Sequence, residues 1–288
     1  MQAIDKHQAR LAFSRAAATY DGAAALQREI ADRMLDRLDY IRLRPQRVVD
    51  IGAGTGAATR ALMERYPQAD VIALDFALPM LQRVRRGEED PVTAPHCLCG
   101  DAEHLPLADA SVDMIFSNVA LQWCNDLPGT FKEFQRVLRP GGMLLFSTFG
   151  PDTLLELRAS WAAADSGSHV SPFLDMHHIG DAMLEAGLAE PVVDVDRLQV
   201  TYGDVISLMR DLKNLGAHNV TWERSRGLTG KGRIKKMQEA YEGFRRDGRL
   251  PASYEVVYGH AWEPEQRRVE GNTLVPLESL RRRLPSHE

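Results

Sequence analysis

VVDIGAGTG, residues 48–56, is a short apolar run that ends in three alternating glycines. A glycine-rich turn between a buried strand and a helix lets the backbone approach a ligand closely. GAGTGA, residues 52–57, also fits the G-x-G-x-x-G/A pattern of dinucleotide sites, which alone is a weak signal. A phosphate-loop NTPase is excluded, because no Gly-Lys-Ser/Thr follows. The turn therefore predicts either a dinucleotide or an adenosyl ligand.

Apolar runs and helical patterns alternate on both sides of this turn. Strands are expected at 47–51, 71–75, 96–99, 112–118 and 143–149, with helices at 57–66, 77–86 and 127–138. Such alternation predicts parallel βαβ units, and hence an α/β fold with an open Rossmann-like sheet covered by helices on both faces. Beyond residue 150 we expect helices at 152–165 and 175–188, an antiparallel strand at 191–202 and a last strand at 252–262.

The chain is predicted to form one domain over residues 1–262, with helical additions to the sheet. Residues 1–40 are expected to form two helices that act as an N-terminal lid, separated near Asp21-Gly22. The cofactor-binding core covers 45–150, and a helical insertion at 203–249 is expected near the substrate. The tail, 263–288, with its Arg281-Arg282-Arg283 run, lies outside this domain.

Composition narrows the functional classes. A net charge of −5 argues against non-specific nucleic-acid binding by the whole chain. The three cysteines include one C-x-C pair, Cys97 and Cys99, which is too few ligands for a metal site, so none is expected. The N-terminus shows no signal-peptide pattern, and no run is long and apolar enough for a membrane span. We therefore expect a cytoplasmic protein without membrane or nucleic-acid partners.

Residues after the glycine turn favour an adenosyl ligand. Asp50 stands directly before the glycines, where a carboxylate suits a cofactor with an ammonium and a sulfonium better than a pyrophosphate. Asp75 ends the next strand and can accept from both ribose hydroxyls. Asp101, with Ala102, follows the third strand and can accept from an adenine amine. EFQRVLRPGGMLLFS, residues 133–147, adds a helix, a Pro-Gly-Gly turn and a strand.

These motifs in this order resemble the class I S-adenosylmethionine-dependent methyltransferases over about residues 45–150. The resemblance implies S-adenosyl-L-methionine as the cofactor. It places the loop glycines at the methionine portion, Asp75 at the ribose, two side chains beside the adenine, Asp101 and Ala102 at its edge, and one amide below the sulfonium. The cofactor residues that it implies are Asp50, Gly52, Gly54, Gly56, Asp75, Phe76, Met80, Asp101, Ala102 and Asn118.

Three further segments resemble the malonyl-acyl-carrier-protein O-methyltransferases that start pimeloyl and biotin synthesis. They are AFSRAAATYDGAAALQ at 12–27, SNVALQWC at 117–124 and LMRDLKNLGAHN at 208–219, and the likeness extends over about 10–262. It implies methyl esterification of the free carboxyl of malonyl-acyl-carrier protein, with no catalytic base assigned. Candidate substrate residues are Tyr20, Gln122, Trp123, Arg210 and Lys213. Basic side chains between 224 and 249 are expected to face the acidic carrier protein.

Other interpretations remain open at this point. FGPDTLLELR at 149–158 and LQVTYGDVISLMRDL at 198–212 also resemble complex I assembly proteins of this fold, a family associated with arginine hydroxylation of a partner subunit. A small-molecule methyltransferase of the quinone type would need a base to deprotonate carbon or phenol. A scaffold that has lost turnover is disfavoured by the complete set of candidate cofactor residues.

Overall fold

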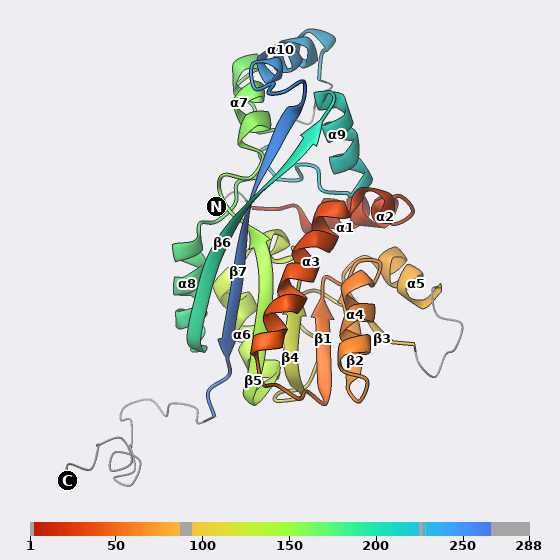
Figure 1. Cartoon of the computed structure of the whole chain (residues 1–288), viewed down its shortest axis with the longest axis vertical. Coiled ribbons are helices and arrows are strands. Elements are labelled where there is room, and N and C mark those ends of the chain that lie inside the picture. The colour runs from red at the N-terminus through yellow and green to blue at the C-terminus, as the bar shows by residue number, and fades with distance from the viewer. Residues whose placement is uncertain (1–2, 87–93, 225–226, 228, 266–288) are drawn as a thin grey trace, which may run out of the picture.

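The computed structural model describes residues 3–86, 94–224, 227 and 229–265, and its centre is a seven-stranded sheet (Figure 1). Every strand expected from the sequence is present. The strands are β1 (Arg47–Ile51), β2 (Asp70–Asp75), β3 (His96–Cys99), β4 (Val112–Ser117), β5 (Leu138–Phe149), β6 (Ala189–Tyr202) and β7 (Leu250–Trp262). β5 begins earlier than predicted, because the Pro-Gly-Gly turn continues into the strand and Leu138 already pairs with Val112.

The strand order β3-β2-β1-β4-β5-β7-β6 confirms the predicted mostly parallel sheet. β1 pairs in parallel with β2 and β4, whereas β7 runs antiparallel to both β5 and β6. The chain order reverses between β1 and β4. In open α/β sheets, ligands bind at the carboxyl ends of the strands beside such a reversal. The glycine loop, which follows β1, lies at this position.

Helices cover both faces of the sheet, as predicted. They are α1 (Lys6–Ala16), α2 (Tyr20–Ala23), α3 (Ala25–Arg37), α4 (Ala57–Arg65), α5 (Leu78–Arg86), α6 (Leu127–Val137), α7 (Leu155–Ala164), α8 (Met176–Glu185), α9 (Val205–Asn214) and α10 (Lys231–Glu242). Apolar side chains of α3 and α4 pack with Val48 on one face, and those of α6 and α8 pack with Val49 on the other. Successive residues of a strand thus place their side chains in two separate hydrophobic cores, one on each face of the sheet.

The helical additions depart from the sequence expectation in detail. The first helix was expected to run to about Tyr20, but α1 ends at Ala16, because the N–H and the hydroxyl of Thr19 both donate to the Ala16 carbonyl. Tyr20 therefore begins a separate turn, α2. The helical block expected at 203–249 is formed by two helices, α9 and α10. Residues 266–288 of the predicted tail lie outside the described residues.

The additions gather at the carboxyl ends of the parallel strands. Figure 1 shows α1 and α2 across the tips of β1 and its neighbours, with α7, α9 and α10 around the far ends of β6 and β7. The N-terminal helices and α9 therefore enclose the region where the glycine loop ends.

Within the described ranges, no helix has the length and apolar character that crossing a membrane requires.

Candidate active site

Three cavities meet at the carboxyl ends of β1 and β4, and Tyr20 lines all of them. We call the first the strand-end cavity; it lies over β2 and β3 and includes Asp75, Met80 and Asp101. The second, the loop cavity, lies between α3 and the glycine loop and includes Asp50. The third, the large cavity, lies between α2, α7 and α9 and has a volume of about 650 Å³. A ligand that spans the first two would thus reach the third beside Tyr20.

The glycine loop has the backbone geometry that its sequence predicted. Gly52, Gly54 and Gly56 have φ angles of +75°, +55° and +84°, which side chains rarely tolerate. A side chain at position 52 would also overlap Ala120. Gly52 lines the strand-end cavity and the loop cavity, so the loop presents bare backbone to both. Such a cradle fits a ligand that lies directly against the chain.

Two buried carboxylates follow the first two strands. Asp50 is 1% exposed and accepts a hydrogen bond of 2.6 Å from Thr59 Oγ1, while Asp75 is 6% exposed. The Asp75 oxygens accept backbone N–H bonds from Gly54 at 3.0 Å and Ala77 at 2.7 Å. Burial raises the pKa of Asp50 to about 7 and that of Asp75 to about 6. The pair is thus poised to ionise when a cationic ligand arrives.

The strand-end cavity is a narrow apolar slot. Phe76 and Met80, the two side chains predicted to flank an adenine, line it together with Phe13 and Trp123. Its volume is about 70 Å³. That is well below the roughly 300–1,000 Å³ of a pocket for a drug-sized ligand. The slot alone is thus smaller than a typical ligand pocket as the N-terminal helices lie here.

Asp101 closes one end of the slot in an unpredicted ion pair. Lys6 Nζ lies 2.6 Å from Asp101 Oδ1 and also contacts Glu103. Burial disfavours the ammonium charge, but hydrogen bonds to Asp101 and Glu103 outweigh it and raise the pKa of Lys6. Asp101 Oδ1 also accepts from the Glu103 N–H at 3.0 Å, so this carboxylate caps the next turn. Ala102 lines the same cavity.

Asn118 joins α3 to the sheet below the point where the cavities meet. Its Nδ2 donates to the Gln27 carbonyl at 2.8 Å, and its Oδ1 accepts from Ser147 Oγ at 2.9 Å. Asn118 lines the strand-end and loop cavities, whereas Gln27 lines the loop and large cavities. Among the described residues, none forms a hydrogen bond with the buried Oε1 of Gln27, so this atom can still accept one.

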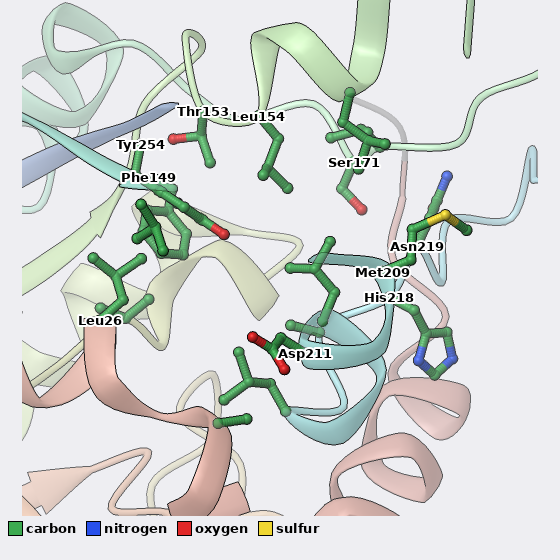
Figure 2. A pocket seen from close by; sticks show the side chains of 18 of the residues that line it. Leu26, Phe149, Thr153, Leu154, Ser171, Met209, Asp211, His218, Asn219 and Tyr254 are labelled. Carbon is green, nitrogen blue, oxygen red and sulfur yellow. The ribbon is translucent and has the colours of Figure 1, made fainter. Parts of the chain in front are cut away.

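The large cavity is mostly apolar, with a few polar groups. Figure 2 shows Leu26, Phe149, Leu154 and Met209 around it, together with the carboxylate of Asp211 on α9. Such a cavity matches the general form of a small-molecule site, which is a largely apolar hollow with few polar groups. Tyr20 faces this space as well. Burial and then the nearby charges of Asp75, Asp21 and Asp50 raise the pKa of Tyr20 far above its usual value, so its hydroxyl remains a donor.

The structure brings together only some of the predicted substrate residues. Gln122 and Trp123 line the large cavity with Tyr20. The Gln122 side chain is already engaged, since its Nε2 donates to the Val119 carbonyl at 2.7 Å and its Oε1 accepts from Thr148 at 3.2 Å. Arg210 and Lys213 are exposed and do not line the cavity. They lie on the outer face of α9, because the apolar residues Leu208 and Leu212 turn the opposite face inward.

The basic segment at 224–249 is mostly at the surface. Lys231, Lys235 and Lys236 are exposed on α10. Several of its charges have acidic partners, among them Lys235 with Glu239 at 3.7 Å and Arg233 with Asp165 at 3.6 Å. Arg226 lies outside the described residues.

The chain is similar in sequence to known methyltransferases. A family profile described as a methyltransferase domain matches residues 49–146. Proteins named malonyl-[acyl-carrier protein] O-methyltransferase are similar over nearly the whole chain. The one from Methylovorus sp. is 51% identical over 96% of this chain and 95% of its own. The one from Gallionella capsiferriformans is 53% identical over 92% and 93%, and that from Halorhodospira halophila is 47% identical over 98% and 97%.

Solved structures with low identity share the fold. A Bacillus halodurans protein matches with a TM-score of 0.57 at 16% identity, over 81% of this chain and 98% of its own. The YcgJ protein of Bacillus subtilis matches with a TM-score of 0.56 at 21% identity, over the same shares of the two chains. At these identities the likeness speaks for the architecture alone.

Proposed function

This chain belongs to the malonyl-[acyl-carrier protein] O-methyltransferase family, and we propose from that membership that it methylates the free carboxylate of a malonyl thioester carried by acyl-carrier protein. The chain is an S-adenosyl-L-methionine-dependent O-methyltransferase with the class I fold. One observation carries the assignment of the site. A glycine-loop region and a large apolar cavity share the wall that Tyr20 forms.

The described residues fit the cofactor. The bare backbone of the glycine loop and the buried carboxylate of Asp50 suit the methionine portion with its ammonium. Asp75 suits the ribose hydroxyls, and Phe76 and Met80 suit the faces of the adenine. When bound, the cofactor supplies a methyl group on a positively charged sulfur. We assign the adenine edge to Asp101 and Ala102, and the floor below the sulfur to Asn118.

The acceptor needs orientation rather than activation by a base. A malonyl carboxyl is already ionised at neutral pH. The Tyr20 hydroxyl, kept protonated, can donate to one carboxylate oxygen while the other faces the methyl group. A neutral donor orients the carboxylate without neutralising its charge. A buried Arg or Lys would neutralise that charge and so weaken the nucleophile. Holding the two groups in line can supply roughly 7–11 kcal/mol of the barrier. Gln122 and Trp123 would complete the walls at this point.

The N-terminal helices act as a lid in this proposal. The slot over β2 is too narrow for a purine, and Lys6 of α1 lies across its end. Opening the lid admits the cofactor, and closing it excludes water and brings Tyr20 over the transfer point. Residues 1–262 would then work as one domain, with 1–40 as the lid, 45–150 as the cofactor core and 203–249 as a wall of the acceptor site.

Acyl-carrier protein would dock on the basic segment at 224–249. The exposed lysines of α10 support this placement, since a basic patch on an acidic protein steers an acidic partner. A Lys235→Glu/Lys236→Glu variant should raise KM for malonyl-acyl-carrier protein but leave a small malonyl thioester unaffected. Lys132→Glu, on α6 away from the site, is the matched control.

The relatives do not favour the two rival activities. Their names specify O-methyl transfer, whereas a complex I assembly-type hydroxylase would oxidise a protein side chain. A quinone-type methyltransferase would need a base beside the acceptor, for which the described lining offers His169, His218 and Asp211, but none of the relatives' names indicates such chemistry.

Transfer of labelled methyl from S-adenosyl-L-methionine tests the proposal. Malonyl-acyl-carrier protein should become labelled, and acetyl-acyl-carrier protein, which lacks the free carboxyl, should not. Equal labelling of both carriers, or of neither, would contradict the proposed acceptor.

A further inference from the structure

A single carboxylate stands in the wall of the large cavity. Of the residues that line this cavity, all of them within the described chain, Asp211 is the only one with an Asp, Glu, Lys or Arg side chain. Figure 2 shows its carboxylate projecting from α9 into the cavity. Its neighbours on that wall include the apolar side chains of Met209, Leu212 and Leu215.

The hydroxyl of Tyr202 lies beside this carboxylate. Burial, the negative charge of Asp211 and a hydrogen bond to it raise the pKa of Tyr202 to about 12, so the Tyr202 hydroxyl donates to Asp211. An ionised carboxylate offers about four acceptor positions. The carboxylate is half-buried and faces the cavity, so it keeps acceptor positions for N–H or O–H donors of a ligand.

A negative wall is at odds with an acceptor that is itself a carboxylate, unless the two are kept apart. The carboxylate to be methylated belongs at Tyr20, where the three cavities meet. α9 lies next to that point, since Thr19 Oγ1 donates to the Asn214 carbonyl at 2.9 Å. Asp211 lies about one helical turn before Asn214 on α9, so we expect it to face the part of the acceptor beyond the thioester.

The arm that delivers an acyl group on a carrier protein carries N–H donors that could bind the Asp211 carboxylate. It is a phosphopantetheine chain, in which an amide N–H follows the thioester sulfur after a two-carbon link. An N–H bonded to a carboxylate is a charge-assisted hydrogen bond, stronger than one between neutral groups. The arm carries a second amide N–H and a hydroxyl farther along, so this N–H is the donor nearest the thioester.

We propose, on the basis of the proposed function, that Asp211 is the positioning residue for this arm. Its carboxylate accepts the amide N–H nearest the thioester, and Tyr202 holds the carboxylate in place. The contact fixes how deeply the arm enters and so sets the malonyl carboxylate against Tyr20. The same negative charge repels free malonate, whose second carboxylate would lie where the thioester chain should be.

Two small acceptors separate this role from a structural one. The malonyl thioester of N-acetylcysteamine carries the amide N–H, and the malonyl thioester of butanethiol has a chain of similar length without it. In Asp211→Ala, kcat/KM for the first should fall roughly tenfold or more, because a hydrogen bond to a charged group is lost. For the second it should stay within about twofold. Asp36→Ala, an exposed site on α3, is the matched control and should change neither.

Two further variants keep the test independent of folding. Asp211→Asn preserves size and one acceptor oxygen, and should reduce activity on the amide-bearing thioester less than Asp211→Ala does. Tyr202→Phe should weaken the same substrate selectively, because it frees the carboxylate to turn away. A loss that is equal for both thioesters, or absent for both, would overturn the role of Asp211. If the wild-type protein methylates neither thioester nor malonyl-acyl-carrier protein, the proposed function itself fails, and Asp211 has no arm to position.

Discussion

The side-chain amide of Asn118 donates a 2.8 Å hydrogen bond to the backbone carbonyl of Gln27, which precedes it by 91 residues. The oxygen of the same amide accepts from Ser147 at 2.9 Å. One residue at the end of β4 thereby connects α3 to β5. Because Asn118 also lines the strand-end and loop cavities, which we propose hold the cofactor, we expect the position of α3 and the occupancy of these cavities to be linked.

Removing this link should weaken both stability and cofactor binding. In Asn118→Ala, the Gln27 carbonyl and the Ser147 hydroxyl each lose a partner. We expect unfolding free energy to fall by about 1–3 kcal/mol and the Kd for S-adenosyl-L-methionine to rise several-fold. Urea denaturation and calorimetric titration measure the two effects. A variant with wild-type stability and affinity would show that the amide does not couple α3 to the site.

Cofactor affinity should increase with pH. In the ligand-free protein, burial raises the pKa of Asp50 to about 7 and that of Asp75 to about 6. A bound cation favours the ionised carboxylates, so it lowers these pKa values, and binding below about pH 7 releases protons. Affinity should therefore rise between about pH 5.5 and pH 7.5 and then level off.

Calorimetric titration in two buffers with different protonation enthalpies measures the proton release directly. Asp50→Asn should bind more weakly and release fewer protons at about pH 6. Asp181→Asn, at an exposed position on α8, should behave like the wild type. Affinity that is constant or falls with rising pH would contradict a cationic ligand beside Asp50.

The ion pair between Lys6 and Asp101 should slow the opening of the lid. Its atoms are only partly shielded, so its contribution is modest. In Lys6→Met, which keeps the apolar stem, dissociation of S-adenosyl-L-methionine should become roughly two- to fivefold faster. Lys132→Met, which removes an ion pair with Glu185 far from the site, serves as the control. Stopped-flow displacement measures the dissociation rate. Equal rates in both variants would contradict a role of Lys6 in keeping the lid closed.

Replacement of Gly259 and of Gly180 by alanine should change the unfolding free energy in opposite directions. A side chain at Gly259 on β7 would overlap the Phe146 ring, so Gly259→Ala should lower the unfolding free energy by about 1–3 kcal/mol. At Gly180, inside α8, the nearest atom would be Val193 Cγ2 at an ordinary 3.9 Å. Gly180→Ala should therefore stabilise the protein by about 0.5–1 kcal/mol. Urea denaturation distinguishes the two, and destabilisation by both would contradict the packing at Gly180.

Local patterns were enough to predict the sheet and the residues near the glycine loop. The strands were visible as continuous apolar runs because parallel strands are buried on both faces. Asp50, Asp75 and the loop glycines were placed correctly at strand ends, since the end of each parallel strand lies at the same edge. Their contact with a cofactor remains a prediction.

Long-range packing limited the rest of the site. Arg210 and Lys213 were selected for their charge, but helix periodicity turns them outward and brings Asp211 inward. Lys6 belongs to no motif, and Gln27 entered only as the last residue of the segment at 12–27. They belong to the site only because α1 and α3 fold back over the carboxyl ends of the strands. The helical periodicity of α9 places Asp211 on the same face as its apolar residues and could have predicted it. No local pattern predicts the positions of Lys6 and Gln27.

The most direct measurement is the chemical position of the transferred methyl group. Malonyl-acyl-carrier protein is incubated with methyl-labelled S-adenosyl-L-methionine and then treated with mild alkali. A methyl ester formed by orientation of the carboxylate should release all of the label as volatile methanol. Label retained on the acyl carbon would show methylation of carbon rather than of the carboxylate, and would contradict the account.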